Sequence, residues 1–184
     1  FQIQGGAINE IYVALNEDGD FIEEVAEPST PLLATRIGEL GFCLPEGFRG
    51  EVNLGIPPWI AQVSNALDRG FVVTMDYGYE AAELYSPARA HGTLQTYYRH
   101  TQGGSPYQRV GRQDITAHVD FSFVGSEGQS LGLRPLGLRT QAQFLRDMGF
   151  DAMRQQVRDQ GLHDRERNAN TMAMLELVKP EGLG

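Results

Sequence analysis

The residues best suited to chemistry gather in one stretch of the chain, residues 76–121. Five of them could grip a cation or move a proton: Asp76, His100, Asp114, His118 and Asp120. Five more could stack on, orient or make room for a planar cationic group: Tyr77, Gly78, Tyr97, Tyr98 and Thr116. Carboxylates bind guanidinium groups, histidine exchanges protons near neutral pH, and tyrosine rings stack on cations. We take the first set as candidate catalytic residues and the second as candidate substrate-binding residues.

The same histidines and aspartates are of metal-ligand type. His118 and Asp120 would lie on one face of a strand, because side chains two residues apart point the same way. No compact motif joins them to His100 and Asp114, so we expect no metal, and a hydrogen-bonded His–Asp cluster that shapes a polar pocket is favoured. A metal-dependent hydrolase is kept as an alternative. The chain has no serine-hydrolase elbow, phosphate-binding loop or dinucleotide glycine fingerprint.

The stretch is locally basic within an acidic chain. The net charge of the 184 residues is -9, yet no Asp or Glu occurs from Leu84 to Gln113, where Arg89, Arg99, Arg109 and Arg112 lie. The acidic balance argues against nucleic-acid binding, which needs a basic face. The arginines suit an anionic small ligand or an acidic patch, or else a solvated loop whose charges balance acids elsewhere. No apolar run reaches membrane-spanning length.

The elements around the stretch predict an α/β fold. A helix from Pro57 to Gly70 precedes the apolar run Phe71–Met75, and continuous apolar runs are typical of central parallel strands. Ligands bind beyond the carboxyl ends of such strands, so residues 76–78 fall where a site is expected. The alternative is that Asp76 only caps a helix over 79–85.

The remaining pattern predicts further elements on both sides of this unit. On the N-terminal side, we expect a β-hairpin over 1–28 that turns at 16–20 and a helix from Thr30-Pro31 to Gly41. After the unit come a strand over 92–98, a loop over 101–113 and a region over 116–124 that is either a strand or a helix capped by Asp114. The C-terminal part predicts a strand over 133–138, a helix over 140–148 closed by Gly149, a helical region over 151–178 and an approach to a final strand over 179–184. The lone Cys43 cannot form an internal disulfide, which fits a reducing compartment, and its apolar neighbours predict a buried thiol.

Several spaced blocks resemble the MidA-like family of class I S-adenosylmethionine-dependent methyltransferases. The blocks are Asp76-Tyr77-Gly78-Tyr79, Gly92-Thr93-Leu94, His100 and residues 114–121, supported by residues 10–13, 28–31, 51–53, 140–141 and 144–145. The resemblance runs from about Gly6 to Gly149. The family includes the mitochondrial arginine methyltransferase that assists assembly of respiratory complex I.

The resemblance implies a fold and a domain plan. The chain is expected to be the C-terminal part of a Rossmann-like class I methyltransferase sheet, with a β-hairpin insertion and C-terminal helices. It would form a single partial domain over 1–184, with the insertion at 1–28, the second half of the α/β core at 29–149 and a helical segment at 150–184. In the family, the glycine-rich loop and the acidic residue that hold the cofactor lie upstream of the part seen here. The chain alone is therefore expected to bind S-adenosylmethionine poorly.

The resemblance also implies a function. The complete protein would be an S-adenosylmethionine-dependent enzyme that methylates arginine in a protein substrate, a respiratory complex I subunit, in the cytoplasm of a bacterium or the mitochondrial matrix of a eukaryote. Positioning carries most of the catalysis in such a transfer. The aspartates would grip the guanidinium, His100 or His118 would accept the proton, and the tyrosines would stack on the acceptor. The alternative from another class is a non-catalytic protein-binding or assembly factor.

Overall fold

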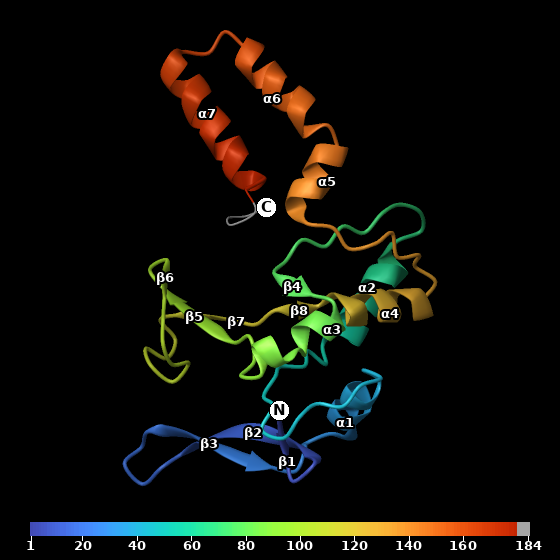
Figure 1. Cartoon of the computed structure of the whole chain (residues 1–184), viewed down its shortest axis with the longest axis vertical. Helices are drawn as coiled ribbons and strands as arrows, with labels where there is room; N and C mark the ends of the chain where they lie inside the picture. The colour runs from blue at the N-terminus through green and yellow to red at the C-terminus, as the bar shows by residue number, and fades with distance from the viewer. Residues whose placement is uncertain (180–184) are drawn as a thin grey trace. The chain divides into compact units, whose positions relative to one another are not determined.

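The computed structural model describes residues 1–179, and the chain divides into two compact units, Phe1–Pro135 and Leu136–Gly184 (Figure 1). Both helices and sheets are present, so the predicted mixed α/β class is confirmed. The single domain expected from the resemblance stays a prediction. Within residues 1–179 no helix combines the length and apolarity needed to cross a membrane.

The first unit begins with a three-stranded antiparallel sheet in the order β1-β2-β3: β1 (Gln2–Gln4), β2 (Ala7–Leu15) and β3 (Phe21–Ala26). The predicted hairpin is confirmed. Its turn closes because the Asn16 side-chain oxygen accepts the N–H groups of Asp18 and Asp20 at 3.0 and 2.8 Å, while Gly19 takes a φ of 84°. Such an Asx-type turn fixes the register of the two strands.

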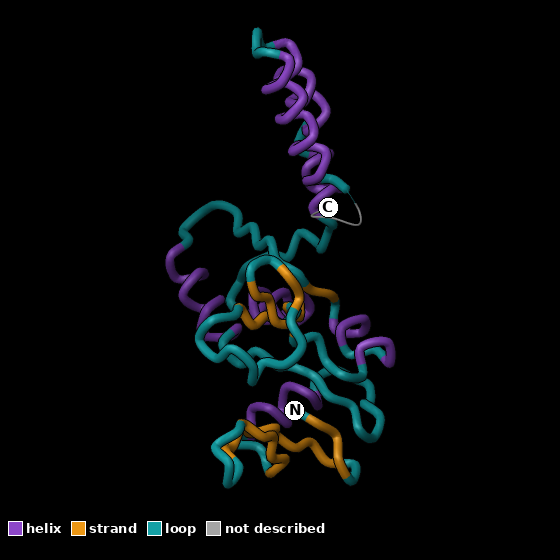
Figure 2. Tube along the Cα trace, turned by 90° about the vertical axis from the view of Figure 1, so that its left-hand side faces the viewer, coloured by secondary structure: helices purple, strands orange, loops and turns teal. Residues whose placement is uncertain are grey.

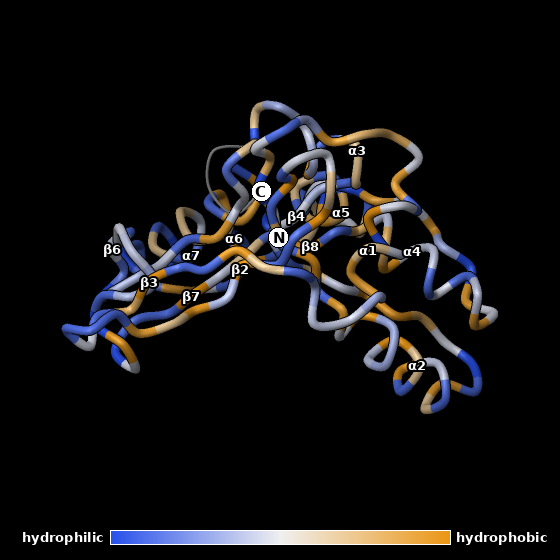
Figure 3. Tube along the Cα trace, turned by 90° about the horizontal axis from the view of Figure 1, so that it is seen from below, coloured by the Kyte–Doolittle hydropathy of each residue, from blue (hydrophilic) through white to orange (hydrophobic). Residues whose placement is uncertain are grey.

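Two helices follow at the predicted places. Helix α1 (Pro31–Gly38) starts where the Thr30 hydroxyl accepts the Leu32 N–H, and it ends before Gly41. Helix α2 (Ile56–Ala66) alternates hydrophobic and hydrophilic positions along its turns (Figure 3). It buries Ile56 and Ile60, whereas Trp59 is 43% exposed. Cys43, predicted buried, is exposed, because it lies in the loop after α1.

The predicted central strand Phe71–Met75 is wrong for the described residues. The segment has no regular secondary structure, and Phe71 and Met75 are 81% and 68% exposed. A buried parallel strand needs hydrogen-bonded neighbours, and no strand within residues 1–179 pairs with this run. The sequence pattern of the run is that of a strand, but within residues 1–179 it has no neighbouring strand with which to form hydrogen bonds.

Short strands and turns follow this segment, and much of the chain around them is loop (Figure 2). In chain order the elements are β4 (Gly78–Tyr79), α3 (Ala81–Leu84), the 3-10 turn η1 (Pro87–Arg89), β5 (Gln95–Tyr98), β6 (Thr101–Gln102), β7 (Asp114–Thr116), β8 (Val119–Asp120) and α4 (Phe121–Ser130). Strand β4 pairs in parallel with β8, and β6-β5-β7 form an antiparallel sheet.

The ambiguous region 116–124 resolves into a strand followed by a helix. Asp120 caps α4 by accepting the Phe123 N–H at 3.0 Å, whereas Asp114 lies in β7, so a helix capped by Asp114 was wrong. Asp76 is likewise not a helix cap, because the residue before α3 is Glu80. The core beneath these elements joins the N-terminal strand to α1 and α3: Phe1, Ile3, Leu33, Ile37, Phe48, Leu84 and Tyr85.

The second unit is helical: α5 (Gln141–Asp147), α6 (Phe150–Asp159) and α7 (Asp164–Leu177). The helix predicted over 140–148 is confirmed as α5, which starts with a capping box between Thr140 and Gln143, and Gly149 (φ 92°) separates α5 from α6. The helical region over 151–178 is confirmed but is broken between α6 and α7. The strand predicted over 133–138 does not form, and the approach to a final strand falls largely on residues 180–184, outside the described residues.

Candidate functional site

The motif that begins at Asp76 meets the motif that contains His118 at the β4–β8 pair. Gly78 lies opposite Val119, and the Val119 N–H donates to the Tyr77 carbonyl at 2.8 Å. A Cβ on Gly78 would lie 2.2 Å from the Val119 carbonyl oxygen, so a side chain there would force the backbones apart. Glycine at 78 therefore allows the close approach that brings the two motifs together.

Thr93 connects His118 to Glu51. The Thr93 hydroxyl accepts the His118 backbone N–H at 2.9 Å and donates to a Glu51 carboxylate oxygen at 3.0 Å, and the Thr93 N–H reaches the same oxygen at 2.8 Å. Gly92 has a φ of 81° and leaves room for this carboxylate, because a Cβ would lie 2.2 Å from it. Neither Thr93 nor Glu51 was predicted as a site residue, although both belong to the spaced blocks of the sequence.

The His118 ring sits in a partly buried and cationic setting. Its centroid lies 5.2 Å from that of Tyr79, and the Arg89 guanidinium lies 3.7 Å from the same tyrosine ring. Burial lowers the pKa of His118 most, Arg89 lowers it further, and Glu51 and Asp76 oppose the shift. The Nδ1 atom is shielded from solvent and has no hydrogen-bond partner among the described residues. His118 is therefore mostly neutral at pH 7, the state in which imidazole accepts a proton.

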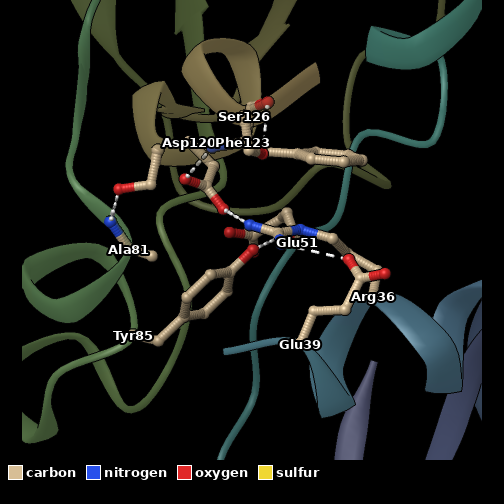
Figure 4. A network of polar contacts seen from close by, with 9 residues as sticks. Arg36, Glu39, Glu51, Ala81, Tyr85, Asp120, Phe123 and Ser126 are labelled. Carbon is tan, nitrogen blue, oxygen red and sulfur yellow. Dashed lines mark hydrogen bonds and ion pairs between the residues drawn. The ribbon is translucent and has the colours of Figure 1, made fainter. Parts of the chain in front are cut away.

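Asp120 is buried and fully engaged (Figure 4). One carboxylate oxygen lies 2.6 Å from Arg36 and the other accepts the Phe123 N–H. The Arg36 guanidinium also lies 4.0 Å from the Phe123 ring, so the ion pair fastens α1 to α4. Nearby, the Tyr85 hydroxyl donates to the Glu51 carbonyl at 3.1 Å, and burial, then the charge of Asp120, raise the pKa of Tyr85.

Three of the predicted residues share one face of the β6-β5-β7 sheet. Tyr97 lies opposite Asp114 and Gln95 opposite Thr116, and alternate residues of a strand point to the same side. Asp114 and Thr116 are exposed, while the Tyr97 hydroxyl donates to Gln95 at 2.6 Å. This face is a polar surface open to a ligand.

Tyr98 and His100 lie apart from that face. Tyr98 follows Tyr97 on β5, so its ring is on the opposite side of the sheet, next to Arg99 and Arg109. His100 is exposed in the turn between β5 and β6, with a φ of 62°. Within residues 1–179, no hydrogen bond or ring contact joins His100 to His118. Over the same residues, no three His, Cys, Asp or Glu side chains are grouped to hold a metal ion.

Residues 1–139 match the family described as “Putative S-adenosyl-L-methionine-dependent methyltransferase”. The chain belongs to this family. Two solved structures from Burkholderia thailandensis match all of the chain with 28% identity and a TM-score of 0.85. One is of an uncharacterized protein, and 48% of its length is covered; the other is bound to S-adenosyl-homocysteine, and 46% is covered. The chain thus spans about half the length of these relatives. No protein with curated annotation matches it.

Members of this family use S-adenosylmethionine, but the described residues do not by themselves fit that cofactor. Two hollows, of about 280 Å³ beside Tyr98 and about 370 Å³ between α6 and α7, are lined without any Asp or Glu that could hold the ribose hydroxyls. The chain has no glycine-rich nucleotide loop either.

Proposed function

We propose that this chain forms the acceptor side of an S-adenosylmethionine-dependent protein arginine methyltransferase. The observation that supports the proposal is the β4–β8 pairing, which joins the segment that follows the exposed Asp76 to the segment that follows the mostly neutral His118. By the family resemblance, the substrate is a respiratory complex I subunit, and the protein works in the bacterial cytoplasm or the mitochondrial matrix.

Asp76 is suited to grip the acceptor. Its side chain is exposed, and among the described residues one of its two oxygens accepts the N–H of Tyr77 at 2.8 Å. The second oxygen is free to accept from a guanidinium, whose paired donors match a carboxylate. Tyr77, 66% exposed, offers a ring on which the guanidinium can stack.

His118 is suited to take the proton. An arginine nitrogen that gains a methyl group must lose a proton, and a neutral imidazole nearby is the usual acceptor. The hydrogen bond from the His118 N–H to Thr93 fixes the backbone at this point, which limits where the ring can lie. S-adenosylmethionine supplies the methyl group when bound.

The polar face of the β6-β5-β7 sheet is proposed to contact the polypeptide around the acceptor arginine. Tyr97, Asp114 and Thr116 point to one side and two of them are exposed. Asp120 is assigned a structural role instead, because its oxygens are engaged by Arg36 and by the start of α4.

The test is methyl transfer by the product of the whole gene, measured with S-adenosylmethionine that carries a labelled methyl group and with a lysate of cells that lack the gene. Acid hydrolysis of the labelled protein should release methylarginine. Label in another amino acid would contradict the arginine assignment, and absence of any label would contradict methyl transfer.

A non-catalytic assembly factor is the second candidate, because neither of the two hollows described above has an acid for the cofactor's ribose. Calorimetry with S-adenosylmethionine separates the two. Micromolar binding by the whole gene product supports the enzyme, whereas no binding, together with stable capture of a partner protein, supports the assembly factor.

A further inference from the structure

Two arginines share one tyrosine ring at the end of β5. The guanidinium carbons of Arg99 and Arg109 lie 5.3 and 4.8 Å from the ring centroid of Tyr98. The two positive charges are thus no farther apart than about 10 Å, roughly one Debye length at 0.1 M salt, and they repel each other. We call Tyr98, Arg99 and Arg109 the cationic hollow.

No acid balances these charges locally. Within residues 1–179 neither Arg99 nor Arg109 makes an ion pair, although Arg36, Arg49 and Arg89 all do. Asp114 is close in the sheet, but it lies opposite Tyr97, so its side chain is on the other face from Tyr98. A bound anion would therefore reduce the repulsion between the Arg99 and Arg109 guanidinium groups.

The shape and chemistry of the site suit an anion. The hollow measures about 280 Å³ and is lined by Tyr98, Arg99, Thr101, Gln102, Gly103 and Arg109. Every polar side chain in this lining can donate a hydrogen bond, and none is a carboxylate. Arg99 and His100, with φ of 51° and 62°, are the two central residues of the tight turn between β5 and β6, so the hairpin itself fixes the backbone of Arg99 beside the hollow.

We propose that the cationic hollow binds carboxylates of an acidic segment in a partner protein. Guanidinium groups bind carboxylates through paired hydrogen bonds. Arg112, exposed and also without an ion pair among the described residues, is tied to Arg109 by a backbone hydrogen bond of 2.8 Å, so a run of several acids would find a third cation nearby. A nucleic acid does not suit a chain with a net charge of -9. The inference does not depend on methyl transfer.

The experiment measures fluorescence anisotropy of a labelled hexaglutamate peptide with the full chain at low salt. Replacing both arginines, Arg99→Gln with Arg109→Gln, should weaken binding about 100-fold, since each charge-assisted contact is worth roughly tenfold. The matched control, Arg158→Gln with Arg165→Gln, removes the same charge from exposed positions of the second unit and should leave binding unchanged.

Further variants and peptides keep the proposal falsifiable. Arg99→Lys with Arg109→Lys keeps both charges and should bind more tightly than the glutamine pair; thermal unfolding confirms that every variant is folded. Equal binding by the wild type and the glutamine pair would overturn the proposal, as would equal losses in the control. A hexaglutamine peptide should not bind. Preference for a phosphoserine peptide over hexaglutamate would overturn the assignment to carboxylates.

Discussion

Two carboxylates flank the β4–β8 pair in opposite circumstances. Asp120, 6% exposed, is held by Arg36 and by the N–H of Phe123, whereas Asp76 is exposed and accepts from the N–H of its neighbour Tyr77. In the polar cluster (Arg36, Glu51, Thr93 and Asp120), Glu51 is half-buried and the others are buried, and the Arg36–Asp120 ion pair and the hydrogen bonds from Thr93 to Glu51 provide partners for the charges. At the β4–β8 edge (Asp76, Tyr77 and His118), Asp76 and Tyr77 are exposed, whereas His118 is half-buried and its Nδ1 is shielded from solvent.

This difference predicts a structural role for the residues of the polar cluster and a role in methyl transfer for the residues of the β4–β8 edge. A buried charge without a partner is costly, so the cluster must be satisfied within the fold. An exposed carboxylate such as that of Asp76 stays hydrated and costs little, and in the proposed function it receives the cationic substrate. Changes in the cluster should therefore act on stability, and changes at the edge should act on methyl transfer.

The largest effect on stability is expected for Arg36→Ala. Removing the guanidinium leaves Asp120 buried and unpaired, which should lower the free energy of unfolding by about 3–5 kcal/mol. Urea denaturation of the chain measures it, with Arg158→Ala, an exposed arginine without an ion pair among the described residues, as the control. A loss equal to that of the control would mean that the ion pair does not hold α1 to α4.

Gly78→Ala should have the next largest effect. The added Cβ would overlap the Val119 carbonyl and push β4 from β8, at a cost of about 2–3 kcal/mol. Gly104→Ala is the matched control, because a Cβ at Gly104 meets nothing within 4 Å. Equal stability of the two variants in urea would contradict the close pairing on which the edge depends.

Thr93→Val should cost less, about 1–2 kcal/mol, because it leaves the His118 N–H and a Glu51 oxygen without the hydroxyl. Thr101→Val, an exposed position on β6, provides the comparison in the same urea measurement. If Thr93→Val is no less stable than Thr101→Val, the connection from Glu51 to His118 contributes nothing to the fold.

The smallest effect is a dependence of stability on pH. Burial lowers the pKa of folded His118 below the value of about 6.5 expected in the unfolded chain, so the unfolded chain binds the proton more readily. The contribution of His118 is present above about pH 6.5 and is lost as the pH falls below it. The urea midpoint of the wild type should drop more between about pH 7.5 and about pH 5.5 than that of His118→Gln. An equal drop in both proteins would contradict the lowered pKa.

Local signals in the sequence predicted local structure well. The hairpin turn over 16–20, the start of α1 at Thr30-Pro31 and the helix over 140–148 are each decided by neighbouring residues, and each prediction is confirmed. The spaced blocks also indicated an S-adenosylmethionine-dependent methyltransferase, which the family match confirms, while the MidA-like assignment stays a prediction.

Long-range partners could not be read from the sequence. Arg36 and Asp120 are 84 positions apart, and no pattern links them, so Asp120 was taken for a catalytic candidate. The Phe71–Met75 run shows the converse: its composition is that of a central strand, but strands form only by pairing, and no strand within residues 1–179 pairs with it. The proposed acceptor role of Asp76 stays a prediction.

The most direct measurement compares Asp76→Asn with Asp120→Asn in the labelled methyl-transfer assay, with thermal unfolding of both variants. Each change removes one negative charge and keeps the shape of the side chain. Asp76→Asn should unfold at the wild-type temperature and lose transfer at least about 100-fold, as expected when one charged contact to the acceptor and its positioning are lost. Asp120→Asn should unfold at a lower temperature and keep transfer for as long as it stays folded. Full transfer by Asp76→Asn, or loss of transfer by an Asp120→Asn variant that is as stable as the wild type, would contradict the account in which the polar cluster stabilises the fold and the β4–β8 edge takes part in methyl transfer.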